Sequence, residues 1–84
     1  MIITYDEHKR IENLKKHGFD FDDLTVEFFA EATIASAKNR RLIAIGFMHD
    51  GVISTVFANL GSEAISVVPM RPASRKERKA HETA

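Results

Sequence analysis

The spacing of hydrophobic residues divides the chain into a helical first part and a sheet-forming second part. A short β-branched and aromatic run at 2–5 predicts a strand. The segment 7–17 is predicted to be a helix, because Asp6 is a suitable N-cap and Gly18 suits the left-handed position that ends a helix. The chain therefore begins with a strand and a well-bounded helix.

A second helix is predicted to follow directly. Asp20 is a suitable N-cap, and two acidic residues in the first turn would favour the helix dipole. The apolar side chains of this segment recur at helical spacing and are expected to face the core: Phe21, Leu24 and Phe28.

The middle and end of the chain are predicted to form a sheet. Residues 31–37 suggest a weak strand, and the nearly continuous apolar run 41–49 is typical of a strand covered on both faces. The dipeptide Asp50-Gly51 predicts a tight hairpin into a strand at 52–60, and another short turn leads to a strand at 64–68. Successive strands with short turns indicate an antiparallel β-meander, so the predicted fold class is α+β.

The last segment contains two prolines around an arginine. Pro69 is expected at the end or edge of a strand, and Pro72 biases Arg71 toward an extended backbone. Ser74 and Glu77 match the S-x-x-E capping box of a final helix. We therefore expect Arg71 at the exit of the sheet, on a stiffened connector.

Composition and charge narrow the class of protein. With 84 residues, 44% of them hydrophobic, 29% charged and none of them cysteine, the chain is expected to be one soluble domain over 1–84. It has no long apolar span or signal-peptide core, so we expect a cytoplasmic location and no membrane partner. The net charge is zero, but residues 1–37 hold four Lys/Arg against eight acids, and residues 38–84 hold eight against four. This asymmetry either creates separate acidic and basic faces or is a simple uneven scatter.

The candidate chemistry rests on basic residues. The sequence has no nucleotide-binding or zinc motif and no histidine pair at ligand spacing, so neither a metal site nor a cofactor is expected. Arginine binds phosphate through its planar fork, which favours a nucleic-acid site, although each cluster is also compatible with an ordinary solvated surface. The basic clusters are Lys15, Lys16 and His17; Lys38, Arg40 and Arg41; and Arg71, Arg75, Lys76, Arg78 and Lys79.

Two motifs resemble the BrnT toxins of bacterial type II toxin–antitoxin systems. The stretch TYDEHKRIENLKKHGFDFDD is similar to the beginning of that family, and MRPASRKERKAH is similar to its R-x-A-[ST]-x-x-E-R ending. The matching positions are Asn13, Lys16, His17, Gly18, Arg71, Ala73, Ser74 and Glu77.

The resemblance implies a RelE-like fold and a ribonuclease that inhibits translation. It also implies neutralisation by a BrnA-like antitoxin, with operator DNA bound only through that antitoxin. Ser66, Pro69 and His81 depart from residues that many relatives carry at these places. A catalytically degenerate or non-enzymatic module that binds the antitoxin or nucleic acid is therefore the alternative.

A metal-independent endoribonuclease needs a proton-transfer group and a cation at the phosphate. We assign phosphate stabilisation to Arg71, helped by Arg75, and proton transfer to His17, because imidazole titrates near neutral pH. His17 could equally be a structural residue at the end of the helix. The residues expected to hold the RNA backbone are Lys16, Arg40, Arg41 and Arg78.

Overall fold

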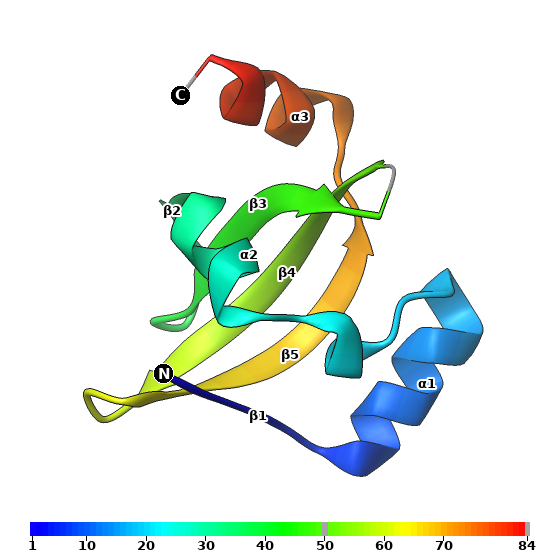
Figure 1. Ribbon diagram of the computed structural model, residues 1–84, viewed down its shortest axis with the longest axis vertical. Coiled ribbons are helices and arrows are strands. Elements are labelled where there is room, and N and C mark those ends of the chain that lie inside the picture. The colour runs from blue at the N-terminus through cyan, green and yellow to red at the C-terminus, as the bar shows by residue number, and fades with distance from the viewer. Residues whose placement is uncertain (50, 84) are drawn as a thin grey trace.

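The computed structural model describes residues 1–49 and 51–83, which form a five-stranded sheet with three α-helices (Figure 1). The predicted α+β class is confirmed. No helix in these two ranges is long and apolar enough to span a membrane. The elements in chain order are β1 (Ile2–Tyr5), α1 (Glu7–His17), the 3₁₀ turn η1 (Phe21–Asp23), α2 (Val26–Glu31), β2 (Thr33–Ser36), β3 (Leu42–Met48), β4 (Gly51–Leu60), β5 (Ala64–Pro72) and α3 (Arg75–Glu82).

The sheet is mixed and has the strand order β1-β5-β4-β3-β2. Strands β2 to β5 pair antiparallel with their neighbours, as successive strands with short turns should. β1, however, lies parallel to β5, with Ile3 opposite Ile65. The predicted antiparallel β-meander therefore does not describe the whole sheet, because the first strand has no neighbour across a short turn and pairs in parallel with the last strand. Met48 pairs with Gly51 across the predicted hairpin, but Asp50 itself lies outside the described residues.

The hydrophobic core lies on one face of the sheet, under η1 and α2. Side chains of one strand alternate between faces, and those of the core face are buried together with Phe21, Leu24 and Phe28. Gly46 lets the Phe28 ring approach the sheet, because a Cβ at this position would lie 2.9 Å from Phe28 Cε2. The predicted core residues are thus confirmed.

The segment expected to be one second helix is two separate elements. Asp20 caps only the short turn η1, by accepting a hydrogen bond from the Asp22 N–H. Leu24 and Thr25 have extended backbones, and the Thr25 hydroxyl accepts from the Phe28 N–H and caps α2. The prediction of a continuous helix was wrong because a threonine side chain can compete with the backbone for the N–H of a helix start.

β5 is longer than predicted and continues through both prolines. Thr55 pairs with Met70 and Phe57 pairs with Val67, so β5 contains one extra residue between these pairs, which is a β-bulge. The bulge includes Pro69, whose missing N–H is not needed there, and the Thr55 hydroxyl donates to the Pro69 carbonyl oxygen at 2.8 Å. Arg71 therefore lies within the strand and not on a connector after it.

α1 is fixed to the edge of β5 by the buried side chain of Asn13. Its Oδ1 accepts a hydrogen bond from the Met70 N–H at 3.0 Å, beyond the end of β1, and its Nδ2 donates to the Phe19 carbonyl oxygen at 3.2 Å. The predicted ends of α1 are confirmed: Asp6 accepts from the His8 N–H, and Gly18 has a φ of 76°. This asparagine joins α1, the following loop and the sheet.

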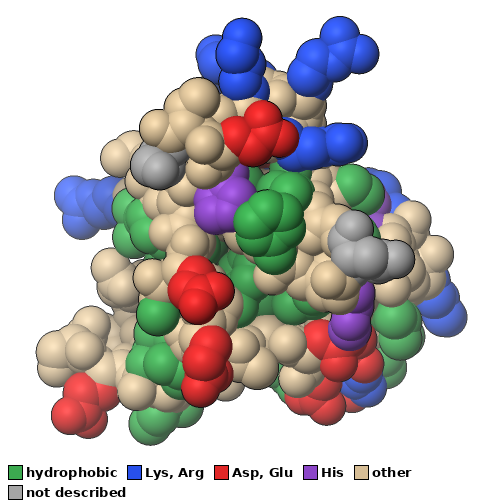
Figure 2. All heavy atoms as spheres, turned by 45° about the horizontal axis from the view of Figure 1, so that its top comes forward, with side chains coloured by type: hydrophobic (Ala, Val, Ile, Leu, Met, Phe, Trp, Pro, Cys, Tyr) green, Lys and Arg blue, Asp and Glu red, His purple; other side chains and the backbone are tan. Residues whose placement is uncertain are grey.

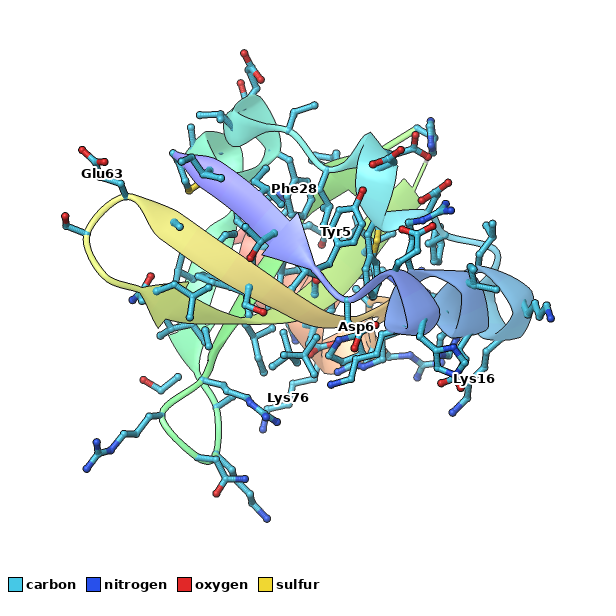
Figure 3. The ribbon with its side chains drawn as sticks, turned by 90° about the horizontal axis from the view of Figure 1, so that it is seen from below. Tyr5, Asp6, Lys16, Phe28, Glu63 and Lys76 are labelled. Atoms are coloured by element: carbon cyan, nitrogen blue, oxygen red, sulfur yellow. The ribbon has the colours of Figure 1, made fainter. Side chains whose placement is uncertain are left out.

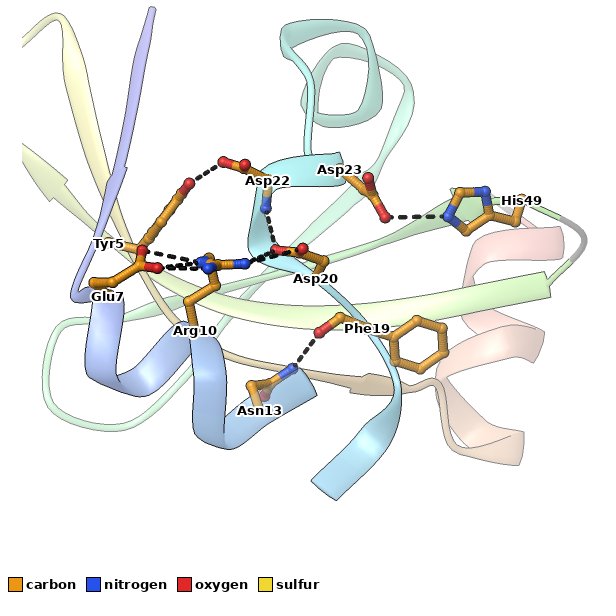
Figure 4. A network of polar contacts seen from close by, with 9 residues as sticks. All are labelled: Tyr5, Glu7, Arg10, Asn13, Phe19, Asp20, Asp22, Asp23 and His49. Carbon is orange, nitrogen blue, oxygen red and sulfur yellow. Dashed lines mark hydrogen bonds and ion pairs between the residues drawn. The ribbon is translucent and has the colours of Figure 1, made fainter. Parts of the chain in front are cut away.

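Polar contacts also hold the acidic side of the molecule together (Figure 4). The Arg10 guanidinium pairs with Glu7 and Asp20, and Tyr5 bonds to Asp22. The bond to Asp22 raises the pKa of Tyr5 to about 12. These contacts connect β1, α1 and η1, and they therefore stabilise the fold.

Candidate active site

Arg71 projects from the face of the sheet opposite the core. It follows Met70, which is buried in the core, and successive side chains of a strand alternate between faces. Nη1 and Nη2 donate to Oε1 and Oε2 of Glu77 at 2.7 and 2.9 Å, and Nη1 also donates to the Pro72 carbonyl oxygen at 3.2 Å. These bonds use three of the N–H donors, of which a guanidinium has about five. In the described ranges Nε makes no hydrogen bond, and the one bond of Nη2 goes to Glu77.

The Glu77 carboxylate accepts further hydrogen bonds besides those from Arg71. Its carboxylate accepts from the Ser74 N–H at 2.8 Å and from the Ser54 hydroxyl at 3.3 Å, and the predicted capping box with Ser74 is confirmed. The hydrogen bond from Arg71 lowers the pKa of Glu77 to about 2, with a further contribution from the Ser74 N–H. Both partners are therefore charged near neutral pH, and their ion pair fixes the guanidinium.

α3 lies across a row of side chains that crosses four strands. Cross-strand pairing places Arg71, Ser54, Ile45 and Thr33 in this row. Glu77 bonds to the first two, and one helical turn later His81 bonds through Nδ1 to the Thr33 hydroxyl at 2.7 Å.

Sequence reasoning assigned neither Glu77 nor His81 a role beside Arg71. Their i,i+4 spacing was a usable signal, because it places both side chains on one face of the helix. His81 also meets the ring of Phe47, with centroids 5.1 Å apart.

The other candidates on α3 line hollows that include neither Arg71 nor Glu77. Arg75 and Arg78 line a hollow of about 450 Å³ together with Lys79 and Glu82. Nε of Arg78 donates to the Ala73 carbonyl oxygen at 3.3 Å. Figure 2 shows Lys and Arg side chains gathered over the end of the molecule that carries α3, whereas most of the visible acids lie below them.

The end of α1 forms a separate hollow at the edge of β5. Lys16 and His17 line this space of about 250 Å³ together with Val68 and Pro69. His17 is half-buried and Lys16 is exposed. The hollow thus opens two residues before Arg71 along the same strand.

Arg40 and Arg41 lie in the turn between β2 and β3. Both are exposed, and Arg40 has a left-handed backbone with a φ of 61°. In Figure 3 this turn extends from the same side of the sheet as Lys16 and Lys76. The predicted RNA-binding residues are consequently not gathered in one pocket, and Arg78 lines a hollow with Phe19 and His49. In the ranges 1–49 and 51–83 no group of three His, Asp or Glu side chains could hold a metal ion.

Comparison with known proteins identifies the family. A family model described as "Ribonuclease toxin, BrnT, of type II toxin-antitoxin system" matches residues 5–77. A comparison with curated proteins gave no match. The crystal structure of the Brucella abortus ribonuclease toxin BrnT is similar, with a TM-score of 0.83 and 47% sequence identity over 89% of this chain and 99% of that chain. The motifs at the two ends, the fold and both comparisons agree, and the chain belongs to the BrnT ribonuclease toxins of type II toxin–antitoxin systems.

Proposed function

We propose that the protein is a metal-independent endoribonuclease that cleaves RNA and thereby inhibits translation. The observation that carries this proposal is the fixed guanidinium of Arg71. Glu77 occupies its Nη1–Nη2 fork, and the Nε–Nη2 edge remains available in the part of the chain described. This edge can donate two parallel hydrogen bonds to one phosphate, and its position is set before the substrate arrives.

Stabilisation of the phosphorane and proton transfer each have a candidate group. The 2′-hydroxyl oxygen attacks phosphorus while a base takes its proton, and the 5′-oxygen leaves with a proton from an acid. Arg71 stabilises the charge of the phosphorane, with Arg75 as a second cation nearer the RNA backbone. His17 is the proposed proton-transfer group, since its hollow opens beside Val68 and Pro69, close in sequence to Arg71.

The backbone of the RNA would follow the basic groups around the outer face. The proposed contacts are four exposed basic residues: Lys16, Arg40, Arg41 and Arg78. Such contacts position RNA without reading its sequence, and they predict binding that weakens steeply with salt.

The family relationship supports further parts of the proposal. We assign the single domain 1–84 to the RelE-like folds and place it in the cytoplasm. A BrnA-like antitoxin is the proposed neutralising partner, and the toxin would reach operator DNA only through it. The alternative, a degenerate module that binds antitoxin or nucleic acid without turnover, is favoured by the occupied fork of Arg71.

Induction in cells tests the proposal. Wild type and Arg71→Ala are expressed at matched levels, and growth and bulk RNA integrity are followed. We expect arrest and RNA decay from wild type only, because losing one preorganised donor slows cleavage by roughly 10²–10³-fold. No arrest from either folded protein would support the binding-only alternative.

A further inference from the structure

The outer face of the sheet contains an apolar strip that no element covers in the described structure. Strand alternation places Ile43, Val56, Ala58 and Val68 on this face, away from the core cluster. All four are only half-buried. α3 covers the neighbouring part of the same face, where Ser54 is almost fully buried.

The strip has room for one more helix beside α3. Leu60, which is exposed, continues the alternation of Val56 and Ala58 to the end of β4. From Val56 to Leu60, β4 advances about 13 Å, at roughly 3.3 Å for each residue. A helix with its side chains is about 10 Å wide. Across the strip, the four strands β2 to β5 span about 14 Å, which corresponds to roughly ten helical residues.

Basic side chains surround this strip. Arg40 and Arg41 lie at one end, and Lys76 of α3 lies at the other. Lys16 lies at the β5 edge, in a hollow that also contains Glu12 (Figure 3). The rim is thus mainly positive around an aliphatic floor.

We propose that this strip binds an amphipathic α-helix of the antitoxin, with an aliphatic face and acidic flanks. The charge of the rim complements acidic flanks. A protein helix fits the floor better than RNA does, because the strip offers aliphatic side chains and no aromatic ring on which a base could stack. Phe47, the exposed aromatic of β3, lies against His81 of α3. A bound helix would cover the approach to Arg71 and so block the site.

This inference rests on the proposed antitoxin partner but not on catalysis, and the test separates the two. Binding of the co-produced, purified BrnA-like antitoxin is measured by calorimetry without RNA, and RNA cleavage is measured separately. Val56→Glu places a charge on the floor and is expected to weaken antitoxin binding about 10- to 100-fold. Val26→Glu, at an exposed apolar position of α2, is the matched control and is expected to bind like wild type.

Two further measurements keep the test decisive if Val56→Glu folds poorly. Arg41→Glu reverses a rim charge and should also weaken binding, and hydrogen exchange should show protection of β3 and β4 amides on complex formation. Unchanged affinity of a folded Val56→Glu variant would overturn the proposal. So would loss of binding in Val26→Glu alone, or protection of the strip by RNA and not by the antitoxin. If the protein binds the antitoxin as expected but does not cleave RNA, only the ribonuclease assignment is contradicted.

Discussion

Replacing Glu77 by glutamine tests how firmly the guanidinium of Arg71 is held. Glutamine preserves the capping box and can accept one bond from Arg71, but it removes the charge. The ion pair lowers the pKa of Glu77 from 4.5 to about 2, and such a shift corresponds to about 3 kcal/mol in the free energy of unfolding. Water screens the pair because the Arg71 side chain is 38% exposed. We therefore expect a loss of about 1–2 kcal/mol at pH 7, or roughly 5–15 °C in Tm.

The pH dependence gives the same prediction a second test. A carboxylate with a lowered folded-state pKa stabilises the protein above its unfolded value, and the stabilisation is lost as pH falls through the folded value. The difference between wild type and Glu77→Gln should thus be complete above pH 4.5 and shrink toward pH 2. Urea unfolding followed by circular dichroism measures it, with Glu82→Gln, exposed on the same helix, as control. Equal stability of wild type and Glu77→Gln at pH 7 would show that the Arg71–Glu77 ion pair does not stabilise the fold.

Three further substitutions test the framework of the site by unfolding free energy. Asn13→Ala should cost about 2–4 kcal/mol, because it leaves two backbone groups near α1 without their partner, whereas exposed Asn59→Ala should cost little. Gly18→Ala should cost about 1–2 kcal/mol through its φ of 76° alone, since a Cβ there meets nothing within 4 Å. Gly46→Ala should cost about 1–3 kcal/mol, because its Cβ would press on the Phe28 ring, and Phe28→Leu should relieve part of that cost.

Local chemistry made the helix ends and turns predictable. Asp6, Gly18 and the Ser74–Glu77 capping box act within a few residues of themselves, so the sequence is sufficient to find them. The break at Thr25 was missed because both Asp20 and Thr25 are suitable N-caps, so local sequence does not decide where the helix begins. Burial of the apolar residues decides between the two N-caps.

Long-range pairing made the rest unpredictable. The parallel position of β1 beside β5 joins segments about sixty residues apart, and no turn signal encodes it. The bulge at Pro69 depends on the register with β4, and it decides that Arg71 lies within the strand. Arg71 was selected as a candidate from its sequence context, but its pairing with Glu77 could be seen only from the position of α3 over the sheet.

Metal-independent ribonuclease activity can be measured by cleavage of an end-labelled single-stranded RNA by purified protein in the presence of EDTA. We expect cleavage by wild type, products that end in a 2′,3′-cyclic phosphate, and a rate roughly 10²–10³-fold lower for folded Arg71→Ala. Arg71→Lys keeps the charge but not the two-donor edge, and it should recover only part of the rate. Cleavage by Arg71→Ala at the wild-type rate would contradict the assignment of this arginine to the reacting phosphate.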